Sequence, residues 1–303
     1  MTGEKLMTND LDEIMKSLED GILQFMDSEK FKDYLKAVSK FHNYSTNNVI
    51  LISMQKPDAS LVAGFNTWKK HFNRHVMKGE KAIRIIAPMP FTVEKEQDRV
   101  DQYGNAYKEK VLVTVPRFRA VSVFDVSQTD GDPLPNINPI ELKADVNDYS
   151  NFLKALINTA VVPVRFTDIE GTAKGYFHIR NNEICIANGM GESQTIKTLI
   201  HEIAHSVLHN NSTFGVLLPQ KTKEIQAESV AFAVCSHFEI DTSDYTFPYI
   251  SGWSGEQNIT EFRNSMDTIR NAASQLITSI EENYSALTQE RLPAEKEKKG
   301  IER

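Results

Sequence analysis

The segment TLIHEIAHSVLH contains residue types that bind metal ions, in a spacing that suits a single ion. His201 and His205 are four residues apart, so on a helix both imidazoles project from one face and can reach the same zinc ion. Glu202 follows the first histidine, where its carboxylate can take a proton from a water acidified by zinc and later pass it to a leaving amine. The segment therefore predicts a zinc metallopeptidase site, with Glu202 as catalytic base and one zinc per chain.

The residues around this motif bear on whether it is a metal site or two surface histidines beside a solvated glutamate. Ile200, Ile203 and Ala204 place apolar groups around the polar residues. A polar patch within an otherwise apolar helix is typical of a buried site rather than of a solvated face. The sequence therefore favours the metal site.

A catalytic zinc site needs a third protein ligand, and the following helix offers two acidic candidates. Glu224 follows His205 after 18 intervening residues, and Glu228 lies one helical turn further on. We expect Glu224 to bind the metal and Glu228 to hold a zinc-bound histidine in the correct tautomer. The alternatives are the reverse assignment and a helix face on which both acids are solvated.

Two further segments are candidates for contact with a substrate. Tyr249 follows the pair of helices and could line the cleft, with packing in the core as the alternative. Residues 175–187 have the pattern of a β-hairpin, whose edge strand could pair with an extended peptide. A protein substrate of unknown identity is therefore an expected partner.

Hydrophobic periodicity and turn residues predict the elements that position these groups. The elements expected in the second half are helix 147–160, strand 162–166, the hairpin strands 175–179 and 183–187, a long helix from Ser193, and helices 221–238 and 256–283. The elements expected in the first half are helix 10–40, a helix through WKKHF, strands 82–87, 111–115 and 118–124, and a charged hairpin or loop at 94–110.

Residues 65–90 form a basic segment, with six Lys or Arg residues against one acid. Aromatic residues are interleaved with these cations, and single-stranded nucleic acids are bound by aromatic faces for bases and cations for phosphates. The preceding stretch HNYSTNN adds hydroxyl and amide groups that can contact phosphates or bases. The alternative is an amphipathic helix whose aromatic residues face the core. The candidate DNA-binding residues are Tyr44, Asn47, Asn48, Trp68, Lys69, Lys70, Arg74, Lys78, Lys81 and Arg84.

The composition is that of a globular protein without membrane segments. The 303 residues carry a net charge of −7, which argues against a protein that coats DNA over its whole surface. Two cysteines do not make a disulfide framework. The sequence has no apolar run near the roughly 18 residues that span a bilayer, and its start lacks the order of a secretory signal. We expect a cytoplasmic protein with no membrane partner.

Several segments resemble the ArdC-type antirestriction family of mobile elements. They are YSTNNVILI at 44–52, VMKGEKAIRI at 76–85, FRAVSVFDVSQTDGDPLP at 118–135, KGYFHIRNNEICI at 174–186, and the helices with HEIAH and EIQAESVAF. The resemblance implies an N-terminal domain that binds single-stranded DNA and a C-terminal zincin-like metallopeptidase domain. It also implies a role in plasmid or transposon transfer, in which the protein protects the entering DNA.

Together these patterns predict a two-domain α+β protein. The expected parts are a mixed α/β single-stranded-DNA-binding domain over 1–130, a linker over 131–143, a zincin-like metallopeptidase domain over 144–285, and a loose charged tail over 286–303. One alternative is a DNA-binding protector whose zinc is structural and which does not cleave proteins. Another is a regulatory metalloprotease that cleaves a repressor.

Overall fold

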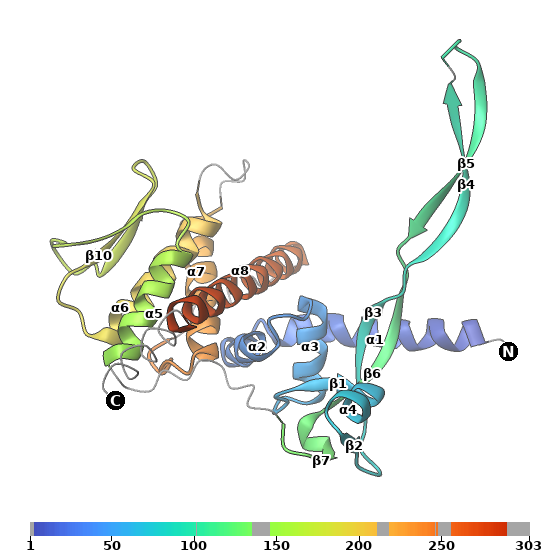
Figure 1. Ribbon diagram of the computed structural model, residues 1–303, viewed down its shortest axis with the longest axis horizontal. Coiled ribbons are helices and arrows are strands. Elements are labelled where there is room, and N and C mark those ends of the chain that lie inside the picture. Colours follow the sequence, from blue (N-terminus) through green and yellow to red (C-terminus); the bar gives the residue numbers. More distant parts are fainter. Residues whose placement is uncertain are drawn as a thin grey trace, which may run out of the picture.

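The computed structural model describes residues 3–100, 102–134, 146–210, 218–245, 247 and 256–289. Helices alternate with several small sheets (Figure 1), which confirms the predicted mixture of α and β elements. In the view of Figure 1, helices α5 to α8 lie on the left, most strands of the first half lie on the right, and α2 and α3 lie between them. Within the described residues, no helix combines the length and apolar character that a bilayer span requires.

Three helices begin the described part of the chain: α1 (Gly3–Gln24), α2 (Ser28–Phe41) and α3 (Thr46–Gln55). The prediction of one helix over 10–40 is wrong, because the chain turns between α1 and α2. Asp27 takes an extended conformation there, and its carboxylate accepts hydrogen bonds from the backbone N–H groups of Glu29 and Lys30. Such an N-cap starts a new helix at the next residue, and Ser45 does the same for α3.

A three-stranded antiparallel sheet with the order β1-β6-β3 lies beside these helices. Its strands are β1 (Val62–Gly64), β3 (Ile83–Pro88) and β6 (Phe118–Asp125). Helices α1 and α3 pack against the sheet, and the short helix α4 (Phe65–His71) packs at the β1 and β6 side. The 3-10 turn η1 (Val126–Gln128) leads from β6 to β7 (Thr129–Gly131), which pairs with β2 (Arg74–Val76). The predicted strands 82–87 and 118–124 are confirmed.

Strands β4 (Phe91–Val100) and β5 (Ala106–Val115) form a two-stranded antiparallel ribbon that projects away from the sheet (Figure 1). The predicted charged hairpin at 94–110 is therefore a pair of long strands. Ion pairs join the two strands: Glu94 with Lys110 at 3.2 Å, Glu96 with Lys108 at 3.3 Å, and Arg99 with Glu109 at 3.0 Å.

In the described residues of the second half, four helices combine with a mixed sheet of order β8-β10-β9. Its elements are α5 (Val146–Thr159), β8 (Val164–Thr167), β9 (Gly175–His178), β10 (Glu183–Ala187), α6 (Glu192–Leu208), α7 (Gln220–His237) and α8 (Glu256–Gln289). Strand β10 runs parallel to β8 and antiparallel to β9, so β9 is an edge strand. Helix α6 packs on both β9 and β10, and α7 packs between α6 and α8.

The predicted linker and tail differ from the structure at their ends. Gly131 is not linker, because it belongs to β7 and pairs with Arg74 of β2. Residues 135–145 lie outside the described residues. Residues 286–289 are not tail, because they continue the last turn of α8, and the remainder of the predicted tail is also outside the described residues.

Most buried apolar residues of both halves belong to one continuous hydrophobic cluster. Phe31 of α2 is fully buried, and its ring lies 5.6 Å from the ring of Phe247 and 5.7 Å from that of Phe262. The hydroxyl of Ser28 donates a hydrogen bond of 2.7 Å to the carbonyl of Phe247. Helix α2 packs directly against α7, which carries Glu224, and against α8.

Candidate metal centre

Helix α6 presents the two histidines of the HEIAH motif. It begins close to the predicted position, but its N-cap is Gly191, which offers no side-chain cap, rather than a serine or threonine. Ile200, Ile203 and Ala204 are buried in the core, whereas His201 and His205 retain partial exposure. The apolar residues fix the rotation of the helix and thereby direct both imidazoles to one side.

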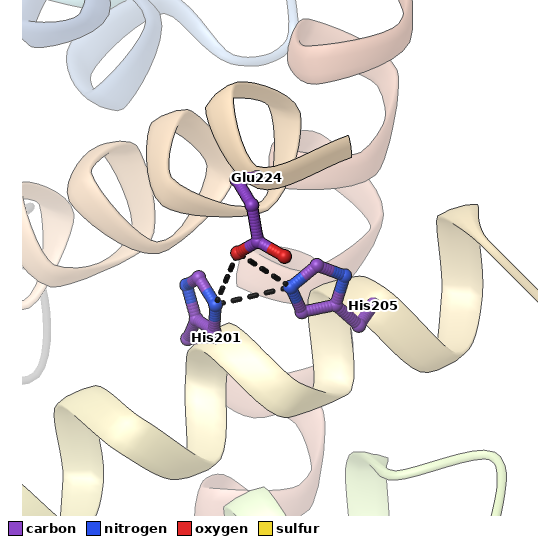
Figure 2. Close-up of side chains that lie close together, drawn as sticks. All are labelled: His201, His205 and Glu224. Carbon is purple, nitrogen blue, oxygen red and sulfur yellow. Dashed lines mark hydrogen bonds and ion pairs between the residues drawn. The ribbon is translucent and has the colours of Figure 1, made fainter. Parts of the chain in front are cut away.

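His201, His205 and Glu224 bring three ligand atoms together, all within 4.8 Å of one another. Figure 2 shows the two imidazoles of α6 facing the carboxylate of Glu224 on α7. The Nε2 atoms of the histidines are 3.0 Å apart. Oε2 of Glu224 lies 3.6 Å from Nε2 of His201 and 3.3 Å from Nε2 of His205. Two imidazole nitrogens and one carboxylate oxygen form a donor set that suits a catalytic zinc ion.

Further polar groups contact the far side of each imidazole ring. Oε2 of Glu228 lies 3.2 Å from Nδ1 of His201. Nδ1 of His205 lies 2.9 Å from Nδ1 of His209, the residue that ends α6. Metal-binding histidines usually have such a partner on the nitrogen that does not bind the metal. The geometry thus favours Glu224 as the ligand and Glu228 as the partner of His201.

The carboxylates around the histidines control the charge of the site. Burial disfavours a charged His201, but hydrogen bonds to Glu224 and Glu228 outweigh it and raise the pKa of His201 to about 9. The same contacts with His201 and His205 lower the pKa of Glu224 far below its ordinary value. Without a metal ion, the site therefore holds an anionic Glu224 beside a protonated His201. A divalent cation would replace that proton.

Glu202 lies beside the triad at a cavity of about 360 Å³, which is also lined by His201, Glu228 and Lys197. Its side chain is largely buried, with 7% exposure. Burial raises the pKa of Glu202, although the nearby histidines and a backbone hydrogen bond from Phe177 oppose the shift. A carboxylate whose pKa is raised toward neutrality is suited to accept and return a proton.

Strand β9 approaches α6 closely next to this cavity. A Cβ atom placed on Gly175 would lie 2.7 Å from Cγ2 of Thr198 and 3.1 Å from the carbonyl oxygen of Cys185. Only glycine permits this approach, because any side chain would push β9 away from the helix. The edge strand therefore lies directly beside the cavity that contains Glu202.

The structure places five of the ten candidate DNA-binding residues in internal contacts. Trp68 is fully buried and its Nε1–H donates to the carbonyl of Phe124, so its ring offers no face to a base. The amide of Asn48 bonds both backbone groups of Ile86 in β3. The others in this group are Tyr44, whose hydroxyl donates to Val62, Asn47, which accepts from Arg263, and Arg74, which donates to Thr129, Gly131 and Asp132.

Four other candidates lie on the surface, and an exposed aromatic residue accompanies them. Lys69, Lys70, Lys78 and Lys81 are exposed, whereas Arg84 is partly buried in β3. Phe65, at the start of α4, is 53% exposed and lies close to the two lysines of that helix in sequence. Helix periodicity does not separate Phe65 from Trp68, because three residues turn a helix by about 300° and leave the two side chains only about 60° apart.

Two further residues bear on the candidate site. Tyr249 lies outside the described residues. His209, which the histidine spacing places eight residues after His201, is buried in contact with His205 and bonds Gln226. The spacing of the three histidines could have indicated that His209 lies near His205. Nothing in the sequence indicates the contact of His209 with Gln226.

Comparison with known proteins relates the first half of the chain to one family. Residues 4–124 match the family model of the N-terminal domain of anti-restriction factor ArdC. A protein of Bacillus anthracis described as uncharacterized is 28% identical over 323 residues, which cover 96% of this chain and 54% of that protein. The chain thus spans about half the length of the curated relative that it matches.

Two crystal structures of the antirestriction ArdC protein from the R388 plasmid are also similar, each with 17% sequence identity over 80% of this chain. The metal-free structure has a TM-score of 0.48 with 86% of its chain covered, and the Mn(II)-bound structure has a TM-score of 0.46 with 85% covered. Residues 4–124 of the chain described here are thus similar to the N-terminal domain of the ArdC antirestriction family.

Proposed function

We propose that the second half of the chain is a zinc-dependent metallopeptidase, with His201, His205 and Glu224 as metal ligands. The observation that carries the proposal is the convergence of these three ligand atoms beside the buried carboxylate of Glu202. A catalytic site keeps a position open for water or substrate, whereas a structural site is closed by protein ligands. The cavity of about 360 Å³ that His201 and Glu202 line supplies that space.

Each polar residue of the site has a distinct task in this mechanism. A divalent cation held by the three ligands would supply Lewis-acid activation of a water molecule and of the substrate carbonyl. Glu202 accepts the proton that the water loses and returns it to the amine that leaves. Glu228 holds the ring of His201 through Nδ1, so that Nε2 points to the site.

Strand β9 is the proposed binding edge for the substrate backbone. Among the described residues it pairs with β10 on one side only, and its Gly175 brings it against α6 beside the cavity. An extended peptide that pairs with β9 would place a backbone carbonyl near Glu202, and strand addition of this kind is a common mode of peptide recognition. The substrate is thus proposed to be a protein segment in extended conformation.

The test compares wild type with Glu202→Gln, which keeps the shape of the side chain and removes its basicity. Metal content and cleavage of an unstructured protein are measured for both, in the presence and absence of single-stranded DNA. We expect equal zinc content of one per chain and cleavage by wild type only. Equal cleavage by both proteins would overturn the role of Glu202. Bound zinc without cleavage by either would favour the alternative of a structural metal.

A second function, binding of single-stranded DNA, is proposed for residues 4–124. The family match supports it, and so do the exposed cations Lys69, Lys70, Lys78 and Lys81. Phe65 is the aromatic residue that is placed to stack on a base, because Trp68 is buried. In a chain with net charge −7, the contact must be confined to this basic surface.

Binding of a fluorescent single-stranded oligonucleotide at several salt concentrations tests this function. Lys69→Glu with Lys70→Glu should weaken binding and flatten its salt dependence, because fewer counterions are released. Phe65→Ala should weaken binding by about 1–3 kcal/mol if a base stacks there. Trp68→Phe is the matched control that should leave the affinity of the folded protein unchanged. Binding without salt dependence would contradict the proposal.

The two functions together suggest protection of DNA that enters a cell during plasmid or transposon transfer. In this proposal the DNA-binding half finds single-stranded DNA, and the metallopeptidase half acts on a host protein near it. A protease that cleaves a repressor is the competing role. It predicts that the lysine variants, which lose DNA binding, keep full protection of transferred DNA in a conjugation assay.

A further inference from the structure

A chain of buried polar contacts leads from the metal site into the core of the second half. Nδ1 of His205 lies 2.9 Å from Nδ1 of His209, and Nε2 of His209 lies 3.1 Å from Oε1 of Gln226. Nε2 of Gln226 then donates a hydrogen bond of 2.9 Å to Oγ of Ser265. His209, Gln226 and Ser265 are 7%, 4% and 5% exposed, so water does not compete for these contacts.

The direction of hydrogen bonding along this chain follows from the amide of Gln226. Its nitrogen donates to Ser265, so its oxygen faces Nε2 of His209 and can only accept. Nε2 of His209 therefore carries a proton, which leaves Nδ1 of a neutral imidazole as an acceptor. Nδ1 of His205 must then be the donor in the contact between the two histidines.

Metal binding by His205 independently requires the same direction, in which Nδ1 of His205 donates a hydrogen bond to His209. Nε2 of His205 faces Nε2 of His201 and the carboxylate of Glu224, so this is the atom that would bind a metal ion. A neutral imidazole that binds through Nε2 carries its proton on Nδ1. That proton needs an acceptor, and Nδ1 of His209 is the acceptor within reach.

We propose that His209 is a positioning residue for His205: supported by Gln226 and Ser265, it fixes the ring and tautomer in which Nε2 of His205 faces the metal. The inference rests on the proposed metal site and extends it to a residue on each of α6, α7 and α8. On the far side of the other ring, Oε2 of Glu228 lies 3.2 Å from Nδ1 of His201.

The contrasting role for His209 is that of a packing residue at the end of α6. Its backbone N–H bonds the carbonyl of His205, and its ring lies 5.1 Å from the ring of His205. A packing role would make stability depend on the volume of the side chain and would leave metal affinity unaffected. The two roles therefore make different predictions for a variant that keeps the side-chain volume but loses the hydrogen-bonding groups. Metal affinity falls only if His209 positions His205.

The test uses the full chain, with the dissociation constant for Zn²⁺ measured by competition with a chromogenic chelator. His209→Phe keeps a ring of similar size and removes both nitrogens. We expect its dissociation constant to rise about 10- to 100-fold, the range found when a group that holds a metal ligand is removed. His209→Asn places an oxygen near the position of Nδ1, so it should restore most of the affinity.

A spectroscopic measurement on the zinc-loaded protein adds a readout that packing does not change. The proton on Nδ1 of His205 should give a downfield resonance that is protected from exchange in wild type and in His209→Asn. It should be lost in His209→Phe. Ser206→Ala is the matched control, since Ser206 is equally buried on α6 but its hydroxyl bonds only the carbonyl of Ile203.

The outcomes separate this inference from the metal site on which it rests. Wild type that binds no metal would overturn both. Wild type that binds zinc, with an unchanged dissociation constant in a folded His209→Phe, would overturn the positioning role alone. If His209→Phe does not fold, Gln226→Met decides, because it keeps His209 and removes its acceptor together with the hydrogen bond to Ser265. Weaker zinc binding by Gln226→Met is then expected, and unchanged binding would contradict the proposal.

Discussion

At the scale of residues, the candidate site places the carboxylates of Glu224 and Glu228 next to two imidazole rings, which can carry compensating positive charge. His201 contacts the carboxylates of Glu224 and Glu228 through its two nitrogens at 3.6 and 3.2 Å. These contacts explain why the pKa of His201 rises to about 9 despite its burial. The site is thus preorganised for a cation, and in its absence a proton takes that place.

Metal affinity should therefore depend on pH in a defined direction. Because a metal ion binds only the neutral imidazole, protons compete with it below the pKa of about 9 on His201. The apparent affinity for Zn²⁺ should rise about tenfold for each pH unit between 7 and 9 and level off above. Competition titrations at several pH values measure this, and calorimetry in buffers of different ionisation enthalpy counts the released proton. A constant affinity over this range would contradict the assignment.

Glu224 and Glu228 should respond differently to replacement by glutamine. Glu224→Gln removes a ligand and should lower the affinity for Zn²⁺ by more than the about 10- to 100-fold expected for Glu228→Gln, which removes a partner of His201. Circular dichroism verifies that both variants keep the fold. A larger loss in Glu228→Gln would reverse the two roles.

Sequence reasoning identified the histidine pair because four-residue spacing on a helix has one geometric consequence. It selected Glu224 from the 18 residues that separate it from His205, and Glu228 from its position one helical turn further on. It did not identify the role of His209, because the contact with Gln226 depends on how α6 packs against α7. It also listed Trp68 as a candidate DNA-binding residue. The spacing of residues does not show that the Nε1–H group of Trp68 donates a hydrogen bond to the carbonyl of Phe124.

At the scale of elements, Asp125 connects the loop before β1 to the end of β6. Its carboxylate accepts hydrogen bonds from the backbone of Ser60 and Leu61 at 2.7 and 3.0 Å, and from Ser127. Burial alone would raise the pKa of Asp125, but these donors outweigh it and lower the pKa. The sheet that carries α4 and its lysines is thereby fixed to the preceding loop.

Asp125→Ala should reduce the free energy of unfolding by about 2–4 kcal/mol, because it leaves buried donors without an acceptor. In wild type, the carboxylate stabilises the fold above the ordinary pKa of an aspartate, and this contribution is lost as the pH falls through the lowered pKa of the folded state. Urea unfolding at neutral and acidic pH measures both effects. Asp58→Ala, at an exposed position, is the control with little expected effect. Equal stability of Asp125→Ala and wild type would refute this role.

The elements themselves were largely predictable, with failures where a local signal competes with periodicity. The apolar spacing of residues 10–40 suggested one helix, although the capping residue Asp27 divides it in two. The hairpin of β9 and β10 was predicted from its alternating pattern. The close approach of β9 to α6 was not predicted. The need for glycine at position 175 depends on contact with Thr198 of α6, which the sequence does not show.

At the scale of the whole molecule, the two halves of the chain share one hydrophobic cluster. Helix α2 contributes Phe31, which packs on Phe247 and Phe262, and Tyr34, whose hydroxyl bonds the carbonyl of Met266 at 3.4 Å. The proposed division into two domains follows the distribution of motifs along the chain. The shared core was beyond sequence reasoning, since apolar periodicity shows that a face is buried but not which helix buries it.

This shared core predicts that the two halves unfold together. Phe31→Ala should lower stability by about 3–5 kcal/mol and should shift the unfolding of both halves of the chain. Calorimetry should show a single transition in wild type and variant, with equal calorimetric and van't Hoff enthalpies. Leu23→Ala is the control, because Leu23 is 50% exposed on α1. Two separate transitions, of which Phe31→Ala shifts only one, would contradict a common core.

X-ray absorption at the zinc edge of the zinc-loaded chain is the most direct test of whether His201, His205 and Glu224 hold one divalent metal ion. We predict one zinc per chain, with two imidazole nitrogens at about 2.0–2.1 Å, at least one further oxygen at about 2.0–2.2 Å, and loss of the imidazole signal in His201→Ala with His205→Ala. Sulfur at about 2.3 Å, which would implicate Cys185 or Cys235, or zinc bound equally by the double variant, would contradict it.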